Sequence, residues 1–205
     1  IESDCILVAE EAYTFFDNVV SGTQDMRTDP FLWGLDRLDD RTTRNLRFRF
    51  DSMTGEGVVV YVLDTRIRID HQEFSDGNGG SRAEEGFAAQ PFLPARSCSS
   101  HGTMVASLVA GQTFGVAKRA TVVSVAMLDC QGRGTLGWTL DAMEFVIRDW
   151  ERRGKPPAVA TWSTGSTCCR GRGGSQNQMA RAMARNGIMM FNSAGNEGRL
   201  ECARS

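Results

Sequence analysis

Asp64 and His101 are the two side chains whose types and positions are best suited to chemistry. Asp64 follows residues 58–63 (VVVYVL), an apolar run with the composition of a buried parallel strand. His101, one of only two histidines, stands at the start of a predicted helix over residues 103–110. Functional residues collect at the carboxyl ends of strands in open α/β sheets. An aspartate there can hold one imidazole nitrogen while the other takes a proton from a nucleophile. The pair is therefore typical of a general base and the residue that orients it.

The helix that carries His101 is predicted to pack closely against another element, because small residues mark one of its faces. These residues are Gly102, Ala106, Ser107 and Ala110. Gly111 follows them, and we expect it to end the helix in the left-handed conformation that glycine favours.

Short motifs around these residues resemble a known enzyme family. Residues 62–65 (VLDT), 101–103 (HGT) and 193–196 (SAGN) are similar, in this order, to three signature blocks of the subtilisin-like serine proteases. More narrowly, residues 33–38 (WGLDRL) resemble the mature amino terminus of the proteinase K and proprotein convertase 9 branch, and residues 128–135 (LDCQGRGT) also match. The resemblance implies an α/β fold, a subtilisin-like parallel sheet with helices on both faces, with its C-terminal part absent.

The resemblance also implies roles for further residues. Asn196 would supply the side-chain amide of the oxyanion hole, which stabilises the negative charge that forms on the substrate carbonyl. Two extended segments would hold a peptide through backbone hydrogen bonds, and their residues are Gly132, Arg133, Gly134, Ser163, Thr164 and Gly165. The nucleophilic serine is expected beyond Ser205, because no serine before that point stands in the matching sequence block.

The sequence thus predicts a serine endopeptidase that cleaves peptide bonds through an Asp–His–Ser triad. Two departures from the family pattern bear on this prediction. Arg66 stands where active relatives usually have glycine or serine, and a cation there could obstruct the site or change the protonation of Asp64. Met104 replaces a common second histidine, a change that we expect to be tolerated. The alternative is a non-catalytic relative with a binding or structural role, marked by Arg66 and by the missing serine.

Six cysteines in 205 residues favour a secreted protein or one in the secretory pathway. Their spacing fits no zinc motif, so no metal is expected at the site. Cys98 and Cys130 fall where the resemblance implies a disulfide near the catalytic histidine. The adjacent Cys168 and Cys169 form a vicinal bridge, or one of them pairs with Cys5; the remaining Cys202 resembles a position whose partner lies further downstream.

The composition is that of an ordinary globular domain, with 41% hydrophobic and 23% charged residues. A formal net charge of −2 argues against a nucleic-acid partner, and no apolar run is long enough for a membrane span. The expected partners are a peptide or protein substrate and a propeptide or covering partner chain. No cofactor is implied, although a structural calcium ion is compatible with the resemblance.

From residue 58 onward, apolar runs alternate with helical patterns, which predicts a parallel α/β sheet. The predicted strands are residues 58–63, 121–128, 158–163 and 188–193, and the predicted helices are residues 103–110, 136–152 and 175–185. We interpret residues 77–94 as a surface excursion and residues 36–53 as a solvated loop. Residues 1–30 are read as a propeptide remnant or an N-terminal extension, and residues 31–205 as an incomplete subtilisin-like peptidase domain.

Overall fold

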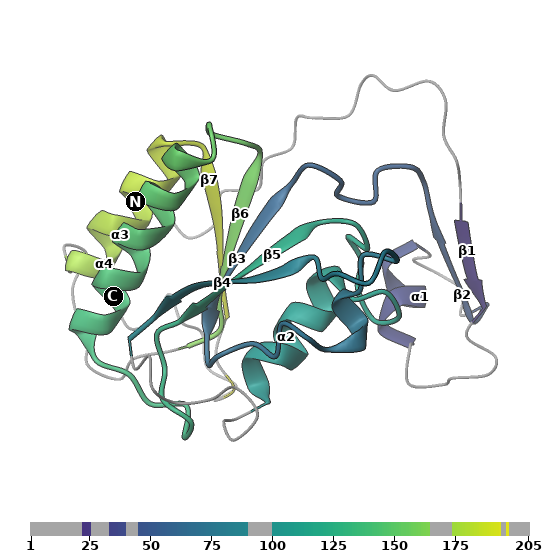
Figure 1. The fold of residues 1–205 in the computed structure, drawn as a ribbon, viewed down its shortest axis with the longest axis horizontal. Helices are drawn as coiled ribbons and strands as arrows, with labels where there is room; N and C mark the ends of the chain where they lie inside the picture. The colour runs from purple at the N-terminus through teal and green to yellow at the C-terminus, as the bar shows by residue number, and fades with distance from the viewer. Residues whose placement is uncertain are drawn as a thin grey trace, which may run out of the picture.

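A five-stranded parallel sheet forms the centre of the structure, a computed structural model that describes residues 22–25, 33–39, 45–89, 100–164, 174–193 and 196. The strand order is β4-β5-β3-β6-β7. Their bounds are Val59–Asp64 (β3), Ala83–Ala88 (β4), Thr121–Ala126 (β5), Ala158–Trp162 (β6) and Ile188–Asn192 (β7). The helices α3 (Leu136–Arg152) and α4 (Ser175–Arg185) lie together on one face, and α2 (His101–Ala110) lies on the other (Figure 1). The predicted α/β fold is confirmed.

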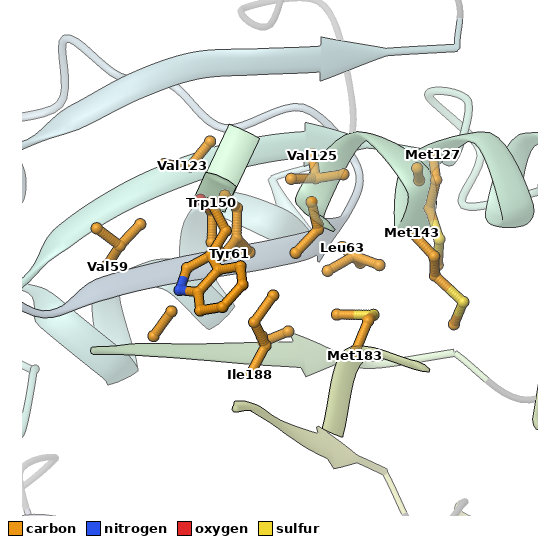
Figure 2. Close-up of a cluster of buried hydrophobic side chains, with 14 residues drawn as sticks. Val59, Tyr61, Leu63, Val123, Val125, Met127, Met143, Trp150, Met183 and Ile188 are labelled. Carbon is orange, nitrogen blue, oxygen red and sulfur yellow. The ribbon is translucent and has the colours of Figure 1, made fainter. Parts of the chain in front are cut away.

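The middle strand β3 is buried along its whole length, which explains its uninterrupted apolar sequence. All six of its residues are buried, as expected for a strand with neighbours on both edges and helices on both faces. Successive side chains alternate between the faces. Tyr61 and Leu63 join the core beneath α3 and α4 (Figure 2), whereas Val60 and Val62 join the core beneath α2. Asp64 continues the second series and therefore faces α2.

The amphipathic helix α3 covers one face of the sheet together with α4. Thr135 caps the start of α3 by accepting a hydrogen bond from the backbone N–H of Trp138 at 3.2 Å. Buried side chains recur along α3 at helical spacing, and these are Thr139, Ala142, Met143, Val146, Asp149 and Trp150. The apolar ones pack against β3 and β5 in the largest hydrophobic cluster of the described residues.

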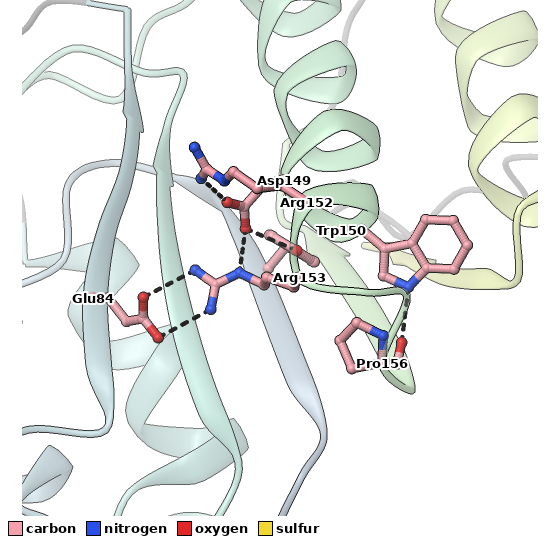
Figure 3. A network of polar contacts seen from close by, with 7 residues as sticks. Glu84, Asp149, Trp150, Arg152, Arg153 and Pro156 are labelled. Atoms are coloured by element: carbon pink, nitrogen blue, oxygen red, sulfur yellow. Dashed lines mark hydrogen bonds and ion pairs between the residues drawn. The ribbon is translucent and has the colours of Figure 1, made fainter.

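A polar network crosses this same face (Figure 3). The hydroxyl of Tyr61 donates to Oδ2 of Asp149 at 3.0 Å. The carboxylate of Asp149 also accepts from the guanidinium groups of Arg152 and Arg153. Arg153 continues to Glu84 on β4, with its nitrogens 2.9 and 3.2 Å from the two carboxylate oxygens. The network therefore ties α3 to both β3 and β4.

All the strands and helices predicted from residue 58 onward are confirmed, with their ends displaced by at most two residues. The interpretation of residues 77–94 as a surface excursion is wrong, because it contains β4. This strand escaped recognition because it lies at the sheet edge and carries Glu84 and Glu85, so that only Ala83 is fully buried.

The interpretation of residues 36–53 as a solvated loop is also wrong. This stretch contains part of α1 (Trp33–Asp39) and all of β2 (Arg47–Phe50). Asp36 is buried because its carboxylate accepts the backbone N–H groups of Asn45 and Leu46, both at 3.3 Å. A further strand, β1 (Gly22–Asp25), pairs antiparallel with β2.

Candidate active site

Asp64 and His101 meet at the carboxyl end of β3. Nδ1 of His101 lies 2.8 Å from Oδ1 and 3.0 Å from Oδ2 of Asp64. The Asp64 side chain is fully buried, whereas 45% of the His101 side chain is exposed. The buried carboxylate therefore contacts one ring nitrogen of His101, while nearly half of the histidine side chain remains exposed to solvent.

The position of Asp64 is set by backbone hydrogen bonds. Its carbonyl oxygen accepts from the N–H groups of Met127 and Leu128 at 3.0 and 3.2 Å, so the strand end is tied to the chain that follows β5. Oδ1 accepts from the N–H of Thr65 at 2.6 Å. This bond from the neighbouring residue holds the carboxylate in one orientation. It also offsets part of the cost of burying the charged group, which would be high without hydrogen bonds.

The position of His101 is set by a close contact between α2 and the residue after Asp64. The backbone N–H of Gly102 donates to Oγ1 of Thr65 at 2.9 Å, and any side chain at Gly102 would overlap the carbonyl oxygen of Thr65. Close packing of the small-residue face is thus observed. No role for Thr65 was predicted from the sequence, although a short hydroxyl residue directly after a strand-end acid is a usable signal.

Gly111 ends α2 for a reason other than the predicted one. Its φ of −64° and ψ of 150° are extended, not left-handed. A side chain there would overlap the carboxylate of Glu73, which accepts the N–H groups of Thr113 and Phe114 at 2.9 and 3.2 Å. Glycine is required at this position for lack of space.

The cation at position 66 makes an ion pair with an acidic residue of the edge strand β4. Nε of Arg66 lies 3.0 Å from Oε1 of Glu85 on β4. The sequence raised the possibility that Arg66 obstructs the site, and the Asp64–His101 contact is in place beside it. Glu85 was missed because its strand was missed.

The other candidate residues follow the strands beside β3. Gly132, Arg133 and Gly134 come after β5, and Ser163 and Thr164 come directly after β6; these are the two neighbours of β3. Asn196 comes after β7 and is exposed. The strands are parallel, so these segments and Asp64 all follow the carboxyl ends of the strands, on one side of the sheet's perimeter. Gly165 and Cys98 lie outside the described residues.

The turn that contains Gly132 is well defined. Oδ1 of Asp129 accepts the backbone N–H groups of Gln131 and Arg133 at 2.9 and 2.8 Å. Gly132 has a φ of 75°, which glycine adopts without strain. Cys130 in this turn is disulfide-bonded; every other cysteine lies outside the described residues, so its pairing with Cys98 stays a prediction.

Within the described ranges, no cluster of three or more histidine, cysteine, aspartate or glutamate side chains is arranged to hold a metal ion. Nor does any helix in this part of the chain have the length and apolar character to cross a membrane. The arrangement is a buried carboxylate in contact with a half-exposed imidazole.

Comparison with known proteins decides the family. The profile of the subtilase family, peptidase family S8, matches residues 55–203. The chain belongs to the subtilase family. This is a family of serine proteases, and the matched region contains both Asp64 and His101.

Several relatives share this assignment. The chain is 34% identical over 165 residues to subtilisin-like protease 7 of Trichophyton equinum and 37% identical over 165 residues to that of Arthroderma gypseum. Each match covers 80% of this chain but only 39% of the relative. This subtilase chain therefore spans about two fifths of the length of these curated relatives.

Solved structures agree on the fold. The crystal structure of a cold adapted subtilisin-like serine proteinase superposes with a TM-score of 0.65 at 31% identity, over 80% of this chain and 56% of that one. The CspB protease of Clostridium perfringens superposes with a TM-score of 0.62 over 72% of this chain and 38% of that one. At 20% identity the second match supports the fold alone.

Proposed function

We propose that this chain is part of a serine endopeptidase of the proteinase K and proprotein convertase 9 branch, in which Asp64 orients His101 as general base. The observation that carries the proposal is the 2.8 Å contact between Nδ1 of His101 and the buried carboxylate of Asp64. The serine proteinases and proteases among the relatives make peptide-bond cleavage the matching reaction.

In this mechanism Nδ1–H of His101 donates to Asp64, so Nε2 is the unprotonated ring nitrogen that acts as the base. Nε2 takes the proton of a serine hydroxyl as its oxygen attacks the peptide carbonyl carbon. The imidazolium, stabilised by Asp64, then gives that proton to the departing amine as the carbon–nitrogen bond breaks. Water repeats the sequence on the acyl-enzyme, with His101 again as base. The serine belongs to the part of the full-length protein beyond residue 205.

Asn196 is assigned the side-chain donor that stabilises the tetrahedral oxyanion. The carbonyl oxygen gains a full negative charge in the intermediate, so a donor placed at that point lowers the barrier. Asn196 follows β7, two strands from β3 at the same sheet edge.

The substrate is an extended peptide held between two segments. Gly132, Arg133 and Gly134 would flank it on the β5 side of Asp64, and Ser163, Thr164 and Gly165 on the β6 side. Backbone hydrogen bonds from two such segments hold any sequence in extended form, and side-chain pockets then add selectivity.

Uncovered apolar side chains support a larger peptidase domain. On α2, Met104 and Leu108 are 51% and 55% exposed. On β7, Met189 and Phe191 are 46% and 55% exposed, and both lie on the α2 side of the sheet because Met189 pairs with Val159, which packs against that core. We assign these surfaces to contacts with the remainder of the domain, a propeptide or a covering chain. The Cys98–Cys130 bridge and a secretory location belong to the same proposal.

Fluorophosphonate labelling of the full-length protein tests this function. The probe should modify one serine, and a peptide library should be cleaved. His101→Ala should abolish both, whereas His71→Ala, at the other histidine of this chain, should leave both intact. A folded full-length protein that neither reacts nor cleaves would instead identify a non-catalytic subtilase.

A further inference from the structure

The ion pair between Arg66 and Glu85 lies close to the proposed active site but has no part in the mechanism. The side chains of Arg66 and Glu85 are 23% and 36% exposed, so the pair is partly shielded from solvent. Arg66 is two residues beyond Asp64, whereas Glu85 comes from the edge strand β4.

The backbone around Arg66 is anchored on both sides. On one side, Oγ1 of Thr65 accepts from Gly102 at 2.9 Å. On the other, the N–H of Ile67 donates to Oγ of Ser124 on β5 at 3.2 Å. Because the main chain is held on both sides of Arg66, the conformation of its side chain determines which acidic group the guanidinium contacts.

Glu85 is directed towards this region by an irregularity in β4. The pairing of β4 with β5 shifts between Glu85 and Phe87, and such bulges re-aim the side chains beside them. Gly86 allows this local geometry, since a side chain there would crowd Val123 and Phe145. Glu85 pairs in register with Ser124, the residue that anchors Ile67, so both acid and loop lie on the α2 side of the sheet.

An arginine two residues beyond the buried Asp64 has two possible effects on His101 as a general base. Its guanidinium can compete with His101 for Asp64, and its charge opposes the protonation of the imidazole. An ion pair with Glu85 suppresses both effects, because it neutralises the cation and holds it on β4.

We propose that Glu85 is a positioning residue that acts through Arg66: it retains the guanidinium on β4 and so reserves Asp64 for His101. This inference rests on the proposed role of the Asp64–His101 pair, and it deepens that role by explaining how the site functions with arginine after the Asp-Thr motif.

NMR titration of the full-length protein labelled with ¹⁵N-histidine tests the proposal. The resonances of His101 and His71 are assigned by single replacement with glutamine. Glu85→Gln should lower the midpoint of the His101 titration by about one pH unit. Arg66→Gln should change it little, because Arg66 is already held away, and the double variant should match Arg66→Gln. Glu85→Asp, which keeps the charge, should restore most of the midpoint.

The asymmetry between the two single variants is the decisive result. Equal and opposite changes in Glu85→Gln and Arg66→Gln would mean that the two charges act only through space, and would overturn the proposal, as would an unchanged midpoint in Glu85→Gln. Asp70→Asn is the matched control, because Asp70 forms another ion pair in this loop, with Arg68 at 3.9 Å. It should affect the adjacent His71 and spare His101.

The readout separates this inference from the proposed function. The titration midpoint needs no substrate and no nucleophile, so it can fail in an active peptidase or succeed in an inactive one. In an active enzyme, Glu85→Gln should additionally lower kcat at constant KM, and Arg66→Gln introduced into that variant should recover kcat.

Discussion

The two faces of the sheet differ in how completely they are covered. Beneath α3 and α4, large side chains such as Tyr61 and Met143 are fully buried and a polar network joins three elements. On the other face, α2 covers β3 and β5, while apolar side chains on its own outer surface and on β7 remain exposed. The larger hydrophobic cluster and the polar network lie on the first face, and the candidate site lies beside the second.

This difference predicts which substitutions should change turnover and which should change stability. The closed face contributes buried area and satisfied charges, which resist unfolding. The open side contributes a small number of groups whose positions depend on backbone contacts between β3 and α2. Substitutions at the open edge should therefore change turnover with little effect on unfolding, and those on the closed face should do the reverse.

The largest expected effect is that of His101→Ala in the full-length enzyme. Turnover should fall by about 10⁴-fold or more, because the serine loses its proton acceptor. The midpoint of urea unfolding should move little, since the ring is half-exposed and packs in no core cluster. A large loss of stability without a loss of turnover per folded molecule would reverse the comparison.

Asn196→Ala should come next, with kcat lowered about 10²–10³-fold at similar KM, the loss known for removal of this donor from subtilisin itself. Steady-state kinetics on a peptide substrate measure it. A rise in KM at constant kcat would instead assign Asn196 to ground-state binding of the substrate.

The two faces can be compared directly through the free energy of unfolding, with one methionine replaced on each face. Met143→Ala, fully buried beneath α3, should lower the free energy of unfolding by about 2–5 kcal/mol. Met104→Ala should lower it by less than Met143→Ala does, because this chain covers only about half of the Met104 side chain and the rest depends on the covering contacts proposed above. Urea titrations of both variants provide the measurement; similar losses would show that the rest of the enzyme buries Met104.

The polar network should give a smaller effect than Met143→Ala, visible as two limits of pH stability. Burial would raise the pKa of Asp149, but hydrogen bonds from Arg153, Arg152 and Tyr61 hold it below its ordinary 3.8. Its stabilisation is therefore complete above that pH and is lost as the pH falls further. Burial and the bond to Asp149 raise the pKa of Tyr61 above its ordinary 10.0, so its stabilisation is lost as the pH rises beyond 10.

Single substitutions separate these two limits. Tyr61→Phe should cost about 1–2 kcal/mol near neutral pH and flatten the alkaline limit. Asp149→Asn should flatten the acid limit. Thermal unfolding across the pH range measures both, and an unchanged alkaline limit in Tyr61→Phe would show that another group sets it.

The sequence was sufficient to predict the sheet because its inner strands are rich in apolar residues. Residues 58–63 read as a strand with buried faces, and Asp64 marked its functional end. The same rule failed for β4, where an edge position permits Glu84 and Glu85. It also failed at α1 and β2, whose small core of Leu35 and Phe48 lies among arginines and aspartates.

Tertiary contacts account for what the sequence could not supply at the site. The partner of Arg66 comes from the missed strand, 19 residues further along the chain. Gly111 was correctly placed at a helix end but for the wrong reason, because its role depends on Glu73, which is distant in sequence. Local patterns predict backbone conformation, whereas these two roles depend on which side chains arrive from elsewhere.

The hydrogen bond from Gly102 to Thr65 joins the strand that carries Asp64 to the helix that carries His101. A backbone amide exchanges its hydrogen with deuterated solvent only when such a bond opens. This particular bond exists only while the strand and the helix touch, so the protection of one buried glycine amide measures the free energy needed to separate the acid from the base. The molecule thus reports on the integrity of its own site without any substrate being turned over.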